Sequence, residues 1–126
     1  MGNILIKGVL LQGRKRDILV TDNIISKIAD SIEAEGATVI DGSKKAAIPG
    51  FVNMHTHSAM TLMRGVNEDS HLQEWLDIIW KMEPRLDEEL IYWGTKLACL
   101  EMIKTGTTCF NDQYWMIDTA VKAISD

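Results

Sequence analysis

The chain has 126 residues, of which 46% are hydrophobic and 25% charged, as is typical of a soluble globular protein. A net charge of −5 provides no basic surface for nucleic acid, and no segment approaches the ~20 apolar residues of a membrane span. We therefore expect neither a nucleic-acid nor a membrane partner. Cys99 and Cys109 lack the spacing of a disulfide or a metal site, which predicts reduced, buried thiols and a cytoplasmic protein.

Residues 1–48 predict short strands separated by turns. Branched apolar residues dominate segments 3–11, 17–20, 24–29 and 38–42, and turn-forming residues lie between them. We expect residues 1–48 to form part of a small β-sandwich domain.

A short apolar strand follows, which begins after Pro49-Gly50 and ends in His55-Thr56-His57. Side chains at positions i and i+2 of a strand share one face, so His55 and His57 present two imidazoles to one small volume. This pattern favours half of a site for a zinc-type ion, whereas a pair that only faces solvent or accepts hydrogen bonds is the alternative. His71 lies apart from the pair, in a predicted helix N-terminal turn, and we expect it on the surface.

The remaining sequence predicts three helices. Ser70 and Gln73 fit a capping box at the start of the first helix, and Pro84 ends it or bends it. Asp87 is the expected N-cap of the second helix, and Gly106 its C-terminal stop. The helical spacing of apolar residues predicts three buried faces: Leu72, Trp75, Leu76 and Ile79; Leu90, Trp93, Leu97 and Leu100; and Ile117, Ala120, Val121 and Ile124.

A buried strand is predicted over residues 107–110, between the second and third helices. The order of strand, helices, strand and helix is the opening of a repeating βα pattern with parallel strands. We expect an α/β fold in which residues 49–126 form the first two βα units of a (β/α)8 barrel. The chain is too short to close such a barrel, which typically needs ~250 residues.

Segments 48–65, 74–83 and 101–108 resemble the opening of the amidohydrolase superfamily. They are most similar to the branch that holds 5′-methylthioadenosine/S-adenosylhomocysteine deaminases, triazine chlorohydrolases and guanine deaminases. The resemblance covers nearly the whole chain and implies the N-terminal portion of a longer metal-dependent hydrolase. Residues 1–47 match only loosely.

The resemblance implies specific roles for three residues. His55 and His57 match the first two ligands of one divalent metal, with zinc expected and iron as an option. Glu83 matches the carboxylate that binds ribose hydroxyls, a role that suits an acceptor-only group, although an exposed acid at a helix end is the alternative. The implied reaction is deamination of adenosine-type compounds by a metal-activated hydroxide.

The family's remaining metal ligands and its proton-shuttling glutamate have no match in this sequence. We therefore assign no catalytic residue within the chain and expect the 126 residues alone to be inactive. Asp112, after the second strand, either orients a ligand histidine or caps the following helix. Four apolar residues could line an adenine pocket: Met60, Met63, Trp75 and Trp80.

The expected partner is a small purine nucleoside-like substrate, with a homo-oligomer as an option. A triazine chlorohydrolase or guanine deaminase is the alternative within the superfamily, and Glu83 discriminates because a bare ring has no ribose. A non-catalytic association module is the alternative from a different class.

Overall fold

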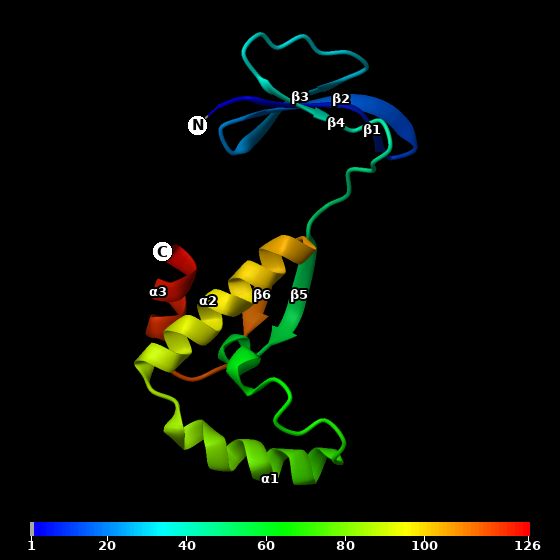
Figure 1. Ribbon diagram of the computed structural model, residues 1–126. Helices are drawn as coiled ribbons and strands as arrows, with labels where there is room; N and C mark the ends of the chain where they lie inside the picture. Colours follow the sequence, from blue (N-terminus) through cyan, green and yellow to red (C-terminus); the bar gives the residue numbers. More distant parts are fainter. Residues whose placement is uncertain (1) are drawn as a thin grey trace. The chain divides into compact units, whose positions relative to one another are not determined.

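The computed structural model describes residues 2–126, which form two compact units, Met1–Pro49 and Gly50–Asp126 (Figure 1). The first unit contains only strands, and the second combines strands and helices. The mixed α/β class is thus as predicted, while the assignment of the two parts to a β-sandwich domain and a barrel stays a prediction. No helix among the described residues is long and apolar enough to cross a membrane.

The first unit is one four-stranded sheet in the order β3-β2-β1-β4. Strand β1 (Ile4–Leu11) pairs antiparallel with β2 (Arg14–Thr21) and parallel with β4 (Thr38–Asp41), and β3 (Ile24–Ala29) pairs antiparallel with β2. All four predicted strands are present. The core of the unit consists of Leu5, Val9, Ile18 and Ile32.

A buried carboxylate secures this sheet. Asp17 accepts hydrogen bonds from the backbone amides of Gly8, at 2.8 Å, and Ile32, at 3.0 Å. Gly8 lies where the β1–β2 register shifts, at φ 67°, a conformation that L side chains rarely adopt. The amide bonds to Gly8 and Ile32 and the charge of Lys7 lower the pKa of Asp17 despite its burial, which acts in the opposite direction.

The second unit is built on two parallel strands, β5 (Phe51–Thr56) and β6 (Thr107–Asp112). The crossover between them contains the short helix η1, the helix α1, the short helix η2 and the long helix α2. Helix η1 spans Ser58–Met63, α1 spans Leu72–Met82, η2 spans Glu83–Arg85 and α2 spans Glu88–Thr105, and the final helix α3 spans Ile117–Ser125. This is the strand, helix, strand and helix order that the sequence predicts.

The ends of α2 are as predicted, and the start of α1 is not. The Asp87 side chain accepts a hydrogen bond from the Leu90 amide at 2.9 Å, and Gly106 ends α2 in the left-handed conformation, at φ 90°. The N-cap of α1 is His71 rather than Ser70, and no side chain caps it. The predicted capping box is therefore wrong, because the helix begins one residue later than the pairing of Ser70 with Gln73 requires.

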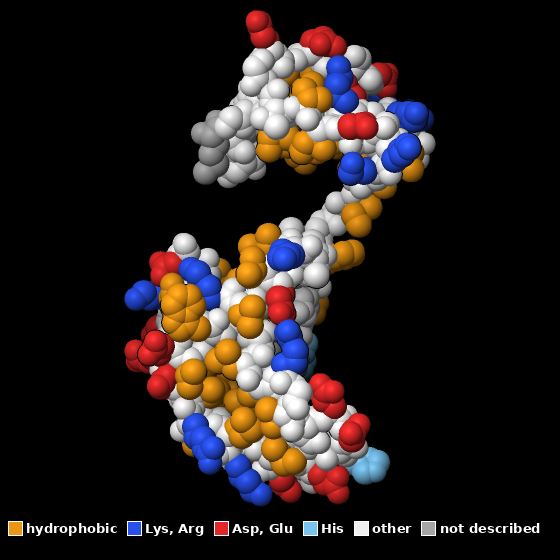
Figure 2. Space-filling view, viewed as in Figure 1, with side chains coloured by type: hydrophobic (Ala, Val, Ile, Leu, Met, Phe, Trp, Pro, Cys, Tyr) orange, Lys and Arg blue, Asp and Glu red, His pale blue; other side chains and the backbone are white. Residues whose placement is uncertain are grey.

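The buried face of α2 also differs from the prediction. The large side chains Leu90, Trp93, Leu97 and Leu100 are exposed in the described structure, whereas Ile91, Gly94, Thr95 and Ala98 are buried. Small residues form this face because α2 approaches η1 closely: a Cβ on Gly94 would lie 2.6 Å from the Ala59 carbonyl oxygen. Figure 2 shows apolar side chains gathered on the surface of the same unit.

Further burial predictions are also wrong. In α3 only Ala120 of the predicted face is buried, while Ile117, Val121 and Ile124 are exposed. Cys109 is exposed and Cys99 half-buried, and both are free thiols. Strand β6 is also predicted to be buried, but its residues are all exposed or half-buried among the described residues.

Candidate metal and substrate site

The two predicted ligand histidines lie together at the carboxyl end of β5. His55 is inside the strand and His57 follows its last residue, Thr56. Their Nε2 atoms are 3.1 Å apart, and their rings meet edge to face with centroids 5.0 Å apart. The i, i+2 spacing therefore does bring both imidazoles to one point, as the alternation of side chains along a strand requires.

The ring of His57 is held in one tautomer by the neighbouring strand. Its Nδ1 lies 2.5 Å from the backbone carbonyl oxygen of Gln113, the residue that follows β6. A carbonyl oxygen can only accept, so Nδ1 carries the proton and Nε2 keeps a free lone pair. Metal-binding histidines commonly show this arrangement, in which one ring nitrogen donates to a carbonyl and the other faces the ion.

The geometry of the pair fits a zinc ion. At the usual Zn–N distance of about 2.0–2.1 Å, nitrogens 3.1 Å apart subtend roughly 100° at a shared ion, close to the tetrahedral angle. Among residues 2–126, no group of three or more histidine, cysteine, aspartate or glutamate side chains could hold a metal ion. The described residues thus offer two imidazole nitrogens with a spacing that fits zinc, fewer than the ligands of a complete site.

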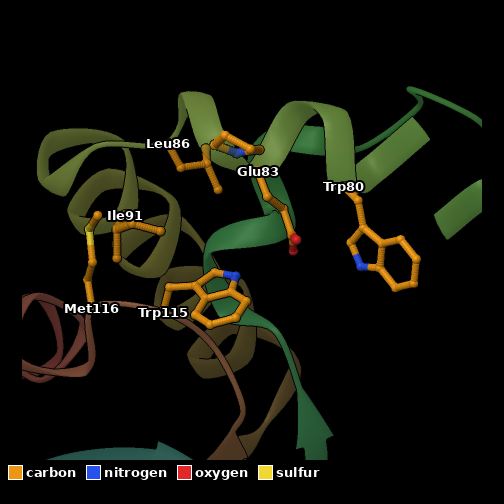
Figure 3. Close-up of a pocket in the computed structure, with 7 residues that line it drawn as sticks. Trp80, Glu83, Leu86, Ile91, Trp115 and Met116 are labelled. Atoms are coloured by element: carbon orange, nitrogen blue, oxygen red, sulfur yellow. The ribbon is translucent and has the colours of Figure 1, made fainter. Parts of the chain in front are cut away.

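Glu83 lies in a pocket between α1 and the segment that follows β6. The pocket has a volume of about 540 Å³, and Figure 3 shows the Glu83 carboxylate directed into the space between the indoles of Trp80 and Trp115. Its remaining lining residues are apolar: Pro84, Leu86, Ile91 and Met116. An acceptor-only carboxylate between two flat aromatic rings can bind a ligand that combines hydroxyl groups with a planar ring.

Tyr114 lies beside both the histidine pair and Glu83. Its ring centroid is 6.1 Å from that of His57, and its buried hydroxyl makes no hydrogen bond of normal geometry with any described residue. Burial raises the pKa of Tyr114, as do the nearby charges of Glu83 and Asp112, so the phenol stays neutral. Tyr114 is thus near both His57 and Glu83.

Sequence reasoning overlooked Tyr114 and Trp115. The signal that could have found them is their position directly after the second parallel strand, at the end where barrel sites form. Of the four residues considered for an adenine pocket, only Trp80 lines the Glu83 pocket. Met60, Met63 and Trp75 line a separate pocket of about 360 Å³ with Ile79. His71 is exposed at the start of α1, as expected.

Comparisons with known proteins agree with this geometry. The model of the amidohydrolase family matches residues 46–126. The 5′-deoxyadenosine deaminases of Methanocaldococcus jannaschii and Methanosphaera stadtmanae are 51% and 50% identical to this chain, over 98% and 90% of its length. The chain spans about 30% and 27% of the length of these two relatives.

Two solved structures share the fold. A zinc-bound adenosine deaminase from Xanthomonas campestris is 29% identical, with a TM-score of 0.80 over 98% of this chain and 31% of its own. A zinc-complexed atrazine chlorohydrolase from Arthrobacter aurescens is 23% identical, with a TM-score of 0.83 over 98% of this chain and 33% of its own. The latter likeness concerns the fold alone. With the family model matching most of its length, this chain belongs to the amidohydrolase family.

Proposed function

We propose that this chain supplies two metal ligands and a substrate-binding acid to a metal-dependent aminohydrolase that deaminates adenosine-type compounds. The observation that carries the proposal is the His55–His57 pair, whose Nε2 atoms lie 3.1 Å apart at the end of a parallel strand. The Glu83 pocket and the deaminases among the relatives support the substrate class. The activity belongs to the complete protein, because the chain corresponds to about 30% of such enzymes.

Three groups of residues have roles in this proposal. His55 and His57 would hold one divalent metal, with zinc favoured over iron, and a bound ion would supply an activated water for attack on the purine. Glu83 accepts hydrogen bonds from ribose hydroxyls, while Trp80 and Trp115 contact the ring. No catalytic residue is assigned among residues 2–126, and we expect the chain alone to show no turnover.

The substrate is proposed to be an adenosine modified at the 5′ position. Several relatives are named 5′-deoxyadenosine deaminases, so 5′-deoxyadenosine is the first compound to test. Methylthioadenosine and S-adenosylhomocysteine share its adenine and its two ribose hydroxyls and differ only at the 5′ substituent. Glu83 is therefore expected to serve all three alike, and a panel of the three compounds decides among them.

Replacement of Glu83 tests the substrate role. The Glu83→Gln change keeps the shape but removes the charge and turns one acceptor into a donor, so one ribose hydroxyl is left without its partner. We expect catalytic efficiency for 5′-deoxyadenosine in the complete enzyme to fall by about 5- to 150-fold, which corresponds to about 1–3 kcal/mol. Inhibition by free adenine should hardly change.

Glu74→Gln is the matched control, because Glu74 is an exposed acid in the first turn of the preceding helix α1. It should affect neither compound. Equal effects of Glu83→Gln on the nucleoside and the base would mean that Glu83 is structural. The triazine chlorohydrolase or guanine deaminase alternative would then be favoured. An intact protein that binds no metal and turns over none of these compounds would favour the association module.

A further inference from the structure

We propose that Asp112 is a positioning residue for His57: its carboxylate fixes the peptide that follows this histidine and so keeps Nε2 directed at His55. The inference rests on the function proposed above, in which both histidines hold a metal. Asp112 would not touch the ion or the substrate, and it would act through the conformation of its neighbour.

The contacts of Asp112 all converge on the residue that follows His57. One carboxylate oxygen of Asp112 accepts from the Ser58 amide at 2.9 Å, and the other accepts from the Ser58 hydroxyl at 2.5 Å. The Ser58 hydroxyl in turn lies 3.1 Å from the hydroxyl of Thr95 on α2. Ser58 is 2% exposed and Thr95 is fully buried, so this network is shielded from competing water.

The Ser58 amide belongs to the peptide group that joins it to His57, which makes its hydrogen bond a direct restraint on His57. The backbone of His57, at φ −125° and ψ 77°, matches neither a regular strand nor a helix, and the chain turns there from β5 into η1. A hydrogen bond to the next amide limits rotation about ψ. This bond acts together with the Gln113 carbonyl, which binds the ring itself, to keep Nε2 of His57 3.1 Å from that of His55.

The end of β6 holds His57 from three directions. Gln113 donates its amide to the Thr56 carbonyl at 2.9 Å and accepts from the His57 ring through its own carbonyl. Asp112 holds the peptide on the other side of His57. The residue before the ligand, its ring and the residue after it are thus all bound to two consecutive residues.

The alternative role for Asp112, a cap for the following helix, does not fit the structure. The N-cap of α3 is Met116, and no side chain caps that helix. Both carboxylate oxygens of Asp112 are instead engaged by Ser58, which is 54 residues away in sequence. Asp112 therefore acts on Ser58, at the carboxyl end of β6, and not on α3.

Zinc affinity of the complete protein, measured by competition with a chelator, tests the inference. We expect Asp112→Ala to weaken zinc binding by about 10- to 100-fold, the usual effect of removing a group that orients a ligand. Ser58→Ala removes one of the two bonds and should have a smaller effect. Asp87→Ala is the control, because the Asp87 carboxylate also accepts from a backbone amide, that of Leu90 at 2.9 Å, but does so in the first turn of α2.

The tautomer of His57 provides a second readout that needs no metal. In zinc-free protein, ¹⁵N NMR should show one tautomer with the proton on Nδ1, and Asp112→Ala should produce a mixture of tautomers. If Asp112→Ala does not fold, Asp112→Leu serves in its place, since leucine has a similar branched shape and no acceptor. Wild-type zinc affinity and a single tautomer in a folded Asp112 variant would overturn the inference.

Failure of the proposed function would look different. In that case the wild-type protein would bind no zinc, or His57→Ala would keep it, whatever residue occupies position 112. The NMR measurement would still report whether Asp112 controls the His57 ring.

Discussion

Each unit of the molecule contains an aspartate whose carboxylate binds backbone N–H groups distant in sequence, two for Asp17 and one for Asp112, but the two differ in what lies next to those groups. Asp17 binds the amides of Gly8 and Ile32, which carry no functional side chain. It thereby holds the bulge at Gly8 and the loop at Ile32 against the sheet. Asp112 binds the amide next to a proposed metal ligand. The same chemistry therefore serves the fold alone in the first unit and both the fold and the site in the second.

The comparison teaches that the role of such a carboxylate depends on which residues lie next to the amide that it binds. Both acids satisfy amides that would otherwise lack acceptors, and in both units the loss of the acid leaves those donors unpaired. Only in the second unit does the freed segment include a histidine that faces another histidine. A variant of Asp17 should accordingly lower stability without changing metal binding, whereas a variant of Asp112 should change metal binding as well.

Loss of a histidine is expected to have the largest effect. In the complete protein, His55→Ala or His57→Ala should reduce zinc affinity by at least about 100-fold and abolish turnover, because one nitrogen ligand is lost outright. The fold should persist, because His55 is exposed and His57 half-buried, and neither belongs to the core. Metal analysis and circular dichroism check the two halves of this expectation. Full zinc occupancy in either variant would show that these residues are not ligands.

Asp17→Ala should give the opposite result. Two buried amides would lose their acceptor, and we expect the free energy of unfolding to fall by about 2–4 kcal/mol. Zinc affinity of the protein that remains folded should not change, since every contact to His57 described above comes from Gly50–Asp126. Asp41→Ala is the control, because Asp41 is exposed and bonds the Ser43 amide only two residues away. A loss of zinc binding in Asp17→Ala would contradict the assignment of Asp17 to the fold alone.

Gly94→Ala should combine a moderate loss of stability with a small effect on the site. The new Cβ would approach the Ala59 carbonyl to 2.6 Å, and overpacking of this kind costs about 1–3 kcal/mol. Alanine gains about 1 kcal/mol of helix propensity over glycine, so a net loss of about 0–2 kcal/mol is expected. Because η1 begins directly after His57, a shift of η1 should also weaken zinc binding slightly. Denaturant unfolding and chelator competition measure the two effects, and a gain in stability of about 1 kcal/mol, which helix propensity alone would give, would contradict the close packing.

The smallest expected effect is the acid dependence of the first unit. The pKa of Asp17 is lowered in the folded state, so its contribution to stability is complete above the unfolded pKa of about 3.9 and is lost as pH falls through the lower, folded value. The difference in unfolding free energy between wild type and Asp17→Asn should therefore shrink below about pH 4. Denaturation curves between about pH 2 and 6 measure this difference. A constant difference would mean that Asp17 is not held as a carboxylate.

Local sequence determined the elements and the histidine pair. The period of two along a strand places His55 and His57 on one face whatever packs around them. Asp87 and Gly106 end α2 through contacts within a few residues of themselves, which sequence contains directly. The strands of the first unit follow from branched apolar residues and turns in the same way.

Tertiary structure alone decided which face of α2 is buried and what holds His57. The large apolar residues of α2 predict a core face, but the approach of η1 to Gly94 selects the small residues instead. Asp112 and Gln113 reach His57 only because β6 pairs in parallel with β5, more than 50 residues earlier in the chain. Such contacts depend on the register of two strands and on the space between elements, and neither quantity is contained in the periodicity of a single segment.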